Sequence, residues 1–98
     1  MIKESTLRLV ILYQGESSQI FKALEELGEL QAALCRYLHD PLKAPDISPI
    51  VDEIADCTIM LRQLSIIFGV ALVDERITFK MDRLNKRLAK WQEADNAT

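Results

Sequence analysis

The spacing of apolar residues along the chain predicts helices rather than strands. Residues 5–14 are predicted as a first helix, although its apolar run Leu9–Leu12 would by itself also suit a strand. Ser17 or Ser18 is a candidate cap for a second helix over residues 18–38. In that helix apolar side chains recur at helical intervals, at Ile20, Ala23, Leu24, Leu27, Leu30, Leu34 and Leu38.

Two further helices are predicted in the second half of the chain, and they differ in their apolar surface. Residues 49–68 carry an apolar stripe and also apolar residues on other sides, so this helix must be covered on more than one side. Residues 74–92 carry one narrow stripe, formed by Ile77, Met81, Leu84, Leu88 and Trp91. We expect residues 92–98 to fray. The pattern predicts one all-α domain over residues 1–98, a four-helix bundle.

Local signals place the connection between the second and third helices. Pro41 stops the second helix, because the residue before a proline is disfavoured in the helical region. Pro41 and Pro45 also make the loop up to residue 47 semi-rigid. Ser48 is a capping hydroxyl followed by Pro49 at the first helical position, which predicts the start of the third helix there.

Composition supports a small helical protein that associates with other chains. The chain has 98 residues, of which 49% are hydrophobic and 28% charged, with only three Gly and three Pro. A chain of this length buries roughly 60–70% of its unfolded surface, so extra apolar faces predict oligomerisation. No apolar run approaches the ~20 residues that span a bilayer, and the N-terminus is a poor signal peptide. We therefore expect a cytoplasmic protein without membrane contact, in which Cys35 and Cys57 are reduced and buried.

Charge is distributed unevenly along the chain. The net charge of −3 argues weakly against general nucleic-acid binding. Residues 16–56 carry nine of the fifteen acids, whereas half of the twelve basic residues fall in one C-terminal segment, at Arg76, Lys80, Arg83, Lys86, Arg87 and Lys90. An acidic patch and a basic patch could therefore face one ligand.

Two acidic pairs lie within the most apolar helical stretches. Glu26 and Glu29, with Glu25 beside them, and Glu53 and Asp56 are each spaced three residues apart, which places each pair on one side of a helix. Two such helices laid together would present four carboxylates across one seam. The ordinary alternative is that these acids are solvated charges on helix surfaces.

Asp56 is the acid that weighs most against that ordinary alternative. Glu53 is explained as a favourable first-turn acid, but Asp56 is expected to be buried inside a helix that is apolar on nearly every side. A buried carboxylate without a partner is costly, and two facing acidic pairs repel each other unless a cation lies between them. Oxygen-only ligands suit Mg²⁺, with Mn²⁺ as a possible substitute.

The acids also resemble the signature of a known family. Glu25-Glu26-Leu27-Gly28-Glu29, then 23 intervening residues, then Glu53-Ile54-Ala55-Asp56 is similar to the EExxE…ExxD motif of the MazG-like all-α nucleoside triphosphate pyrophosphohydrolases. The similarity covers residues 15–92. It implies hydrolysis of a nucleoside or deoxynucleoside triphosphate between its α- and β-phosphates, and a homodimer or a dimer of dimers. Gly28 is unusual within this motif and suggests a close contact there.

The resemblance also implies a role for each site residue. The metal ligands would be Glu26, Glu29, Glu53 and Asp56, with Glu25 as the water-activating base or an outer metal ligand. The phosphate-binding residues would be Lys80, Asn85 and Arg87, for which the alternative is a solvated helix face. Lys22 lies one turn before Glu26, so it either reaches phosphate or pairs with the acids.

Other chemistries lack their residues in this sequence. Di-iron carboxylate bundles use Glu-x-x-His motifs, whereas the residue three before the single histidine, His39, is Arg36. No glycine-rich phosphate loop, Ser/His/Asp set or zinc-ligand spacing is present. The remaining alternative is a catalytically inactive dimerisation or adaptor module of the same fold, which would bind another protein through its apolar third helix.

Overall fold

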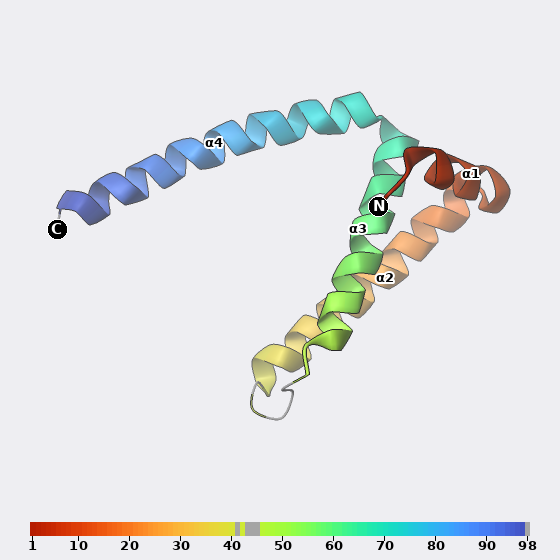
Figure 1. Ribbon diagram of the computed structural model, residues 1–98, viewed down its shortest axis with the longest axis horizontal. Helices are drawn as coiled ribbons and strands as arrows, with labels where there is room; N and C mark the ends of the chain where they lie inside the picture. Colours follow the sequence, from red (N-terminus) through yellow and green to blue (C-terminus); the bar gives the residue numbers. More distant parts are fainter. Residues whose placement is uncertain (41, 43–45, 98) are drawn as a thin grey trace. The chain divides into compact units, whose positions relative to one another are not determined.

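The chain is all-α. The computed structural model describes residues 1–40, 42 and 46–97, and within these residues it contains four helices and no strand (Figure 1). The helices are α1 (Glu4–Gln14), α2 (Glu16–His39), α3 (Ser48–Phe68) and α4 (Val70–Ala97). The prediction of an all-α fold with four helices is confirmed. The semi-rigid loop predicted around Pro41 and Pro45 lies outside the described residues.

The helices fall into two compact units. The first unit, Met1–Ile67, contains α1, α2 and nearly all of α3, and the second unit, Phe68–Thr98, contains α4. In the first unit α2 and α3 lie side by side and antiparallel (Figure 1). The expectation of one domain over residues 1–98 stays a prediction.

A single glycine joins α1 to α2. Gly15 has a φ of 89° and a ψ of 149°, and its N–H donates to the carbonyl of Ile11 at the end of α1. A residue with a side chain rarely adopts this φ, whereas glycine does so at little cost. Because α2 begins immediately after it, at Glu16, the prediction that Ser17 or Ser18 caps this helix is wrong.

A different acceptor from the predicted one caps the start of α3. The helix begins at Ser48, whose backbone N–H donates to Oδ1 of Asp46 at 3.0 Å. These hydrogen bonds from the Ser48 side chain and backbone lower the pKa of Asp46. The predicted cap, Ser48, is therefore the donor, and the aspartate two residues earlier is the acceptor. Pro49 lies in the first turn, as expected.

The buried row of α2 is displaced from the predicted apolar stripe. Buried residues are Gln19, Ala23, Glu26 and Ala33 on α2, and Cys57, Met60 and Gln63 on α3. Leu24, Leu27, Leu34 and Leu38, all in the predicted stripe, are exposed. Small residues in the buried rows give a physical reason, because the side chains at a helix contact decide how closely the helices approach.

Glycine at position 28 does not mark a close contact within the described residues. A methyl group added there would meet no atom within 4 Å. The suggestion of a close approach in the motif is therefore wrong for this chain taken alone. In a helix interior, glycine costs about 1 kcal/mol relative to alanine, so that cost is not offset by packing here.

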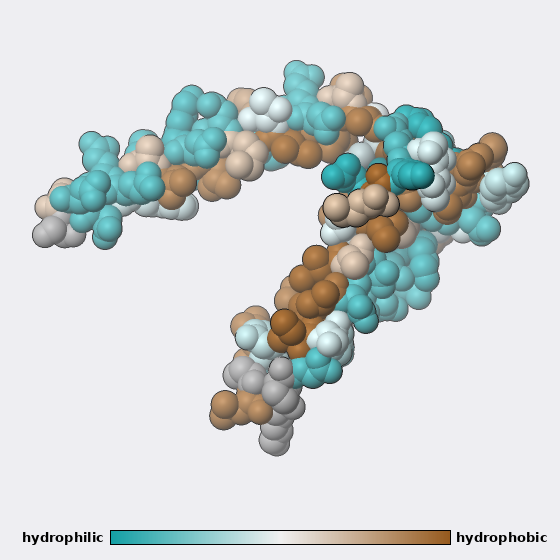
Figure 2. Space-filling model, in the orientation of Figure 1, coloured by the Kyte–Doolittle hydropathy of each residue, from teal (hydrophilic) through white to brown (hydrophobic). Residues whose placement is uncertain are grey.

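The fourth helix is longer than predicted and buries nothing. It begins at Val70, directly after Gly69 with its φ of 123°, and it continues to Ala97 instead of fraying from residue 92. None of the residues Val70–Ala97 is buried, and the predicted stripe is exposed along its whole length: Ile77, Met81, Leu84, Leu88 and Trp91. Figure 2 shows hydrophobic side chains gathered along one edge of α4 and along α3.

The helices were compared with the length and apolar composition that a membrane-spanning helix needs. Among the described residues no single helix is long and apolar enough to cross a bilayer, whereas α3 and α4 pass only when they are taken together as a pair broken between them. The cytoplasmic location stays an expectation.

Candidate metal centre

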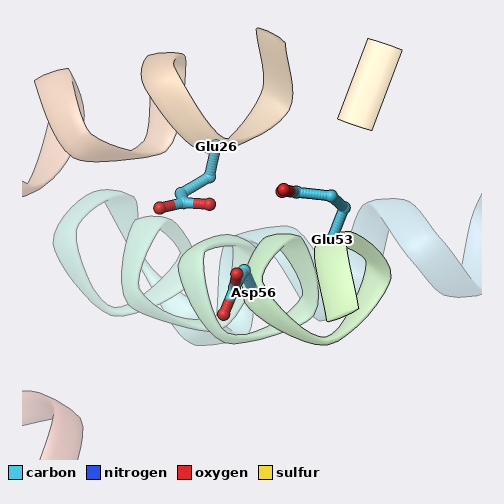
Figure 3. A group of neighbouring side chains, drawn as sticks. All are labelled: Glu26, Glu53 and Asp56. Carbon is cyan, nitrogen blue, oxygen red and sulfur yellow. The ribbon is translucent and has the colours of Figure 1, made fainter. Parts of the chain in front are cut away.

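Three carboxylates from two helices meet in the first unit. Glu26 projects from α2, and Glu53 and Asp56 project from α3 (Figure 3). One oxygen from each carboxylate lies within 4.8 Å of the others. Glu53 and Asp56 share one side of α3 because they are three residues apart, and the antiparallel α2 brings Glu26 to that side. We call these three residues the carboxylate cluster.

Two oxygens of the carboxylate cluster are buried without a partner. Glu26 is only 8% exposed, and Glu53 is half-buried. Oε2 of Glu26 and Oε2 of Glu53 have no hydrogen-bond partner among the described residues. A buried carboxylate oxygen that has lost its water and gained no hydrogen bond is unfavourable. The residues present therefore fit a bound cation, which would satisfy both oxygens.

The expectation that Asp56 is buried is wrong. Asp56 is exposed, whereas Glu53 carries a buried oxygen. The explanation of Glu53 as a first-turn acid is also wrong, because the first turn of α3 contains no acidic residue. The physical reason is the row of α3 that packs against α2: it passes through Glu53, Cys57 and Met60 and leaves Asp56 at its rim. Asp56 still contributes an oxygen to the carboxylate cluster.

Lys22 is paired with the acids on its own helix. Its Nζ lies 3.2 Å from Oε1 of Glu26 and 3.7 Å from Oε2 of Glu25. The hydrogen bond to Glu26 and the charges of Glu25 and Glu26 raise the pKa of Lys22, so its ammonium group stays charged. Of the two predicted alternatives, pairing with the acids is the one that the structure contains, and contact with phosphate stays a prediction.

Glu29 lies close to the carboxylate cluster but outside it. The predicted metal ligand is exposed, and among the described residues it does not join the group formed by Glu26, Glu53 and Asp56. The negative charge of Glu26, followed by partial desolvation and the charge of Glu53, raises the pKa of Glu29. Its carboxylate therefore senses the charge of the cluster, and its role as a fourth ligand stays a prediction.

The two cysteines have different environments. Cys57 is buried, and its Sγ–H donates to the carbonyl of Glu26 at 3.2 Å, which ties α3 to α2 beside the carboxylate cluster. Burial, followed by the charge of Glu53, raises the pKa of this thiol, so it stays protonated and is a poor metal ligand. Cys35 is exposed, which contradicts its predicted burial, because it lies off the row of α2 that faces α3.

A cavity of about 480 Å³ borders Lys22 and Glu25 in the first unit. Its lining combines polar side chains with Phe21 and the buried Met60; the polar members are Gln14, Ser18, Gln19, Lys22 and Glu25. This volume lies within the usual range of small-molecule pockets. Glu25, the predicted base, is exposed and faces this cavity rather than belonging to the carboxylate cluster.

Sequence reasoning did not single out Gln63. Its side chain is buried on α3, and its Oε1 has no hydrogen-bond partner among the described residues. The available signal was its place three residues after Met60 in the row that faces α2. A glutamine in an apolar row is easily read as a surface residue when the packing partner is unknown.

The predicted phosphate-binding residues lie in the second unit. Lys80, Asn85 and Arg87 are all exposed on α4. Their contact with a substrate held in the first unit stays a prediction.

Comparisons with protein-family models, with curated proteins and with solved structures gave no match. The resemblance to the MazG-like family therefore rests on sequence motifs, chiefly the spacing of the acids, and stays a prediction. The geometry of the carboxylate cluster adds one observation to that spacing: the packing of α2 against α3 brings Glu26 to Glu53 and Asp56.

Proposed function

We propose that the protein is a Mg²⁺-dependent nucleoside triphosphate pyrophosphohydrolase, which cleaves a nucleoside or deoxynucleoside triphosphate into a monophosphate and pyrophosphate. The observation that carries this proposal is the carboxylate cluster, with its two buried oxygens that lack partners. Solvated surface acids would not need to bury these oxygens. The resemblance of the acid motifs to those of MazG-like enzymes is the reason for proposing this reaction among the reactions that a metal-bound carboxylate site can catalyse.

Glu26, Glu53 and Asp56 would hold the metal ion, with Glu29 as a candidate fourth ligand. Carboxylate oxygens are the ligands that Mg²⁺ prefers, and Mn²⁺ accepts the same set. When bound, such an ion neutralises charge on phosphate oxygens and acidifies a water molecule. The protein's own part is to fix the three carboxylates on two packed helices.

Residues around the cavity would bind and orient the substrate. Glu25 faces the cavity, where it is a candidate for accepting a proton from the attacking water or for binding the metal in its outer sphere. The cavity is large enough for a small organic group, and Gln14, Ser18 and Gln19 offer polar contacts to it. Lys80, Asn85 and Arg87 would add phosphate contacts, since cationic groups and amides stabilise developing negative charge.

The proposed assembly is a homodimer or a dimer of dimers. Leu24, Leu34 and Leu38 of α2 are exposed, and so is the apolar stripe of α4. Exposed apolar surface on a small protein can mark an interaction site, and α2 and α4 each carry one. A second copy of the chain would cover these surfaces without requiring any other component.

Activity measurements with matched variants test the proposal. Purified protein is incubated with a panel of nucleoside and deoxynucleoside triphosphates in Mg²⁺ or Mn²⁺, and released pyrophosphate is converted to phosphate and quantified. We expect metal-dependent turnover that Glu26→Gln abolishes and that Glu16→Gln, an exposed acid on the same helix, preserves. Absence of turnover by the folded wild-type protein with every nucleotide would contradict the proposal.

A second candidate is a catalytically inactive dimerisation or adaptor module of the same fold. The exposed stripe of α4 favours it, because such a surface also suits another protein. The two candidates differ in their response to metal. The enzyme should be stabilised by Mg²⁺, and Asp56→Ala should remove that effect, whereas melting of an inert module is indifferent to Mg²⁺ before and after the substitution.

A further inference from the structure

Lys22 borders two features of the first unit at once. Its Nζ lies 3.2 Å from Oε1 of Glu26, a member of the carboxylate cluster. The same side chain lines the cavity of about 480 Å³. Glu25, whose Oε2 lies 3.7 Å from Nζ, also lines that cavity. One ammonium group therefore stands between the carboxylate cluster and a space large enough for a ligand.

Lys22 neutralises the carboxylate cluster incompletely. It contacts one oxygen of Glu26, while Oε2 of Glu26 and Oε2 of Glu53 are buried and have no hydrogen-bond partner in the part of the chain that the structure describes. A divalent cation held by the carboxylate cluster would neutralise the same Glu26 carboxylate that Lys22 now neutralises. Two cations close to one carboxylate repel each other, and burial of Glu26 limits the screening of that repulsion.

The Lys22 side chain is free enough to leave. It is 50% exposed, whereas the Glu26 side chain is 10% exposed, so the lysine can rotate without disturbing the packing of α2 against α3. Its flexible four-carbon stem permits such a movement without a change of the backbone. The cavity that it already lines is the nearest place for its charge to act.

We propose that Lys22 is the resident counter-ion of the metal-free carboxylate cluster, that a divalent cation displaces it from Glu26, and that the released ammonium group then binds an anionic ligand in the adjacent cavity. This inference rests on the metal-binding part of the proposed function and does not depend on hydrolysis. The anionic ligand would be a polyphosphate, because an ammonium group beside polar hydrogen-bond donors suits phosphate oxygens. Metal and anion would then favour each other's binding, and by linkage the effect is reciprocal.

Metal affinity of a charge-removing variant tests the displacement. Calorimetric titration with Mn²⁺ alone, at low ionic strength, compares the wild type with Lys22→Met. Because the competing charge is gone, Lys22→Met should bind Mn²⁺ about tenfold more tightly. Lys86→Met is the matched control, since it removes the same charge from another i,i+4 ion pair, with Asp82 at 3.0 Å, and should leave the affinity unchanged.

The outcomes separate this inference from the metal site itself. If the wild type binds Mn²⁺ and Lys22→Met binds it equally or more weakly, the displacement is overturned while the metal site stands. If neither protein binds Mn²⁺, the metal site fails and the inference fails with it. An equal gain in affinity in Lys86→Met also overturns the displacement, because the effect would then reflect net charge alone.

Two further measurements cover the anion and the folding of the variant. In saturating Mg²⁺, Lys22→Met should bind inorganic pyrophosphate several-fold more weakly than the wild type, and equal affinity overturns the transfer of Lys22 to the cavity. In the wild type alone, the side-chain NMR signal of Lys22 should shift toward that of a solvated lysine as Mg²⁺ saturates the protein. An unchanged signal at saturation overturns the displacement even if Lys22→Met does not fold.

Discussion

The α2–α3 pair and α4 have apolar residues at similar helical spacing but differ in which residues are buried. The pair buries rows that contain Glu26, Gln19 and Gln63 and leaves leucines of α2 in solvent, whereas α4 has an apolar stripe without charges and buries none of it. Burial by hydrophobicity alone would have produced the reverse. The difference shows that hydrophobicity alone does not decide which rows are buried in the first unit, and that the stripe of α4 is exposed. If the carboxylate cluster holds a cation as proposed, the α2–α3 contact is arranged around that site.

The largest effect is expected for a substitution in the first unit that lowers metal affinity and raises the stability of the metal-free protein. Glu53→Gln removes a charge whose Oε2 is buried without a partner, so we expect divalent-metal affinity to fall about a hundredfold or more. The same substitution should stabilise the metal-free protein by about 1 kcal/mol, which corresponds to a rise in melting temperature of about 4–8 °C. Metal titration and thermal melting check the two effects. Unchanged metal affinity would show that the α2–α3 contact is not arranged around a cation.

One buried and one exposed methionine allow the packing of the two units to be compared. Met60 on α3 is 6% exposed, and Met81 on α4 is 48% exposed. Met60→Ala should lower the free energy of unfolding by about 2–4 kcal/mol, because truncation of a buried side chain leaves a cavity. Met81→Ala should cost less than about 1 kcal/mol in the isolated chain. Urea denaturation at low protein concentration measures both, and equal costs would contradict the contrast in burial.

The stripe of α4 is expected to matter for assembly. Leu84 is 44% exposed within the stripe, whereas Phe79 is 53% exposed and lies off it, beneath the guanidinium of Arg76. Leu84→Asp should weaken self-association at least about tenfold, since it places a charge in the covered surface. Phe79→Asp controls for the loss of an exposed apolar group. Light scattering across a dilution series measures the oligomeric state of each variant. Identical dissociation of both variants would show that the stripe is not the interface.

The smallest expected effect concerns two glycines. Gly28 lies inside α2 with nothing within 4 Å of an added Cβ, so Gly28→Ala should stabilise the fold by about 0.5–1 kcal/mol. Gly15 has equally open surroundings but a φ of 89°, so Gly15→Ala should instead destabilise it by about 1 kcal/mol. Thermal melting distinguishes the two signs. A loss of stability in Gly28→Ala would point to a contact with a second copy of the chain.

The helices could be predicted from sequence because their signals are local. Gly15 and Gly69 each end a helix, and Pro49 lies at the start of one. These signals depend only on neighbouring residues, so the number of helices could be predicted without knowing how they pack. The length of α4 was not predicted in the same way: the helix begins at Val70, directly after Gly69 with its φ of 123°, and runs to Ala97.

The buried faces could not be predicted, because they depend on which helices meet. An apolar stripe on α2 selects Leu24 and Leu34, but packing against α3 selects the neighbouring row with Ala23, Glu26 and Ala33. On α3, likewise, the apolar pattern did not reveal which row is buried, and Asp56, which was expected inside, is exposed. The grouping of Glu26, Glu53 and Asp56 could be predicted only in part. The i,i+3 spacing places Glu53 and Asp56 on one side of their helix. That Glu26 joins them, and Glu29 does not, depends on which row of α2 faces α3.

The central claim is that the carboxylate cluster binds a divalent cation. Crystals of the wild-type protein grown with Mn²⁺, measured at a wavelength where manganese scatters anomalously, test it most directly. We expect an anomalous peak between Glu26, Glu53 and Asp56, within coordination distance of their oxygens. A well-ordered structure without such a peak, with the three carboxylates turned apart into solvent, would contradict it.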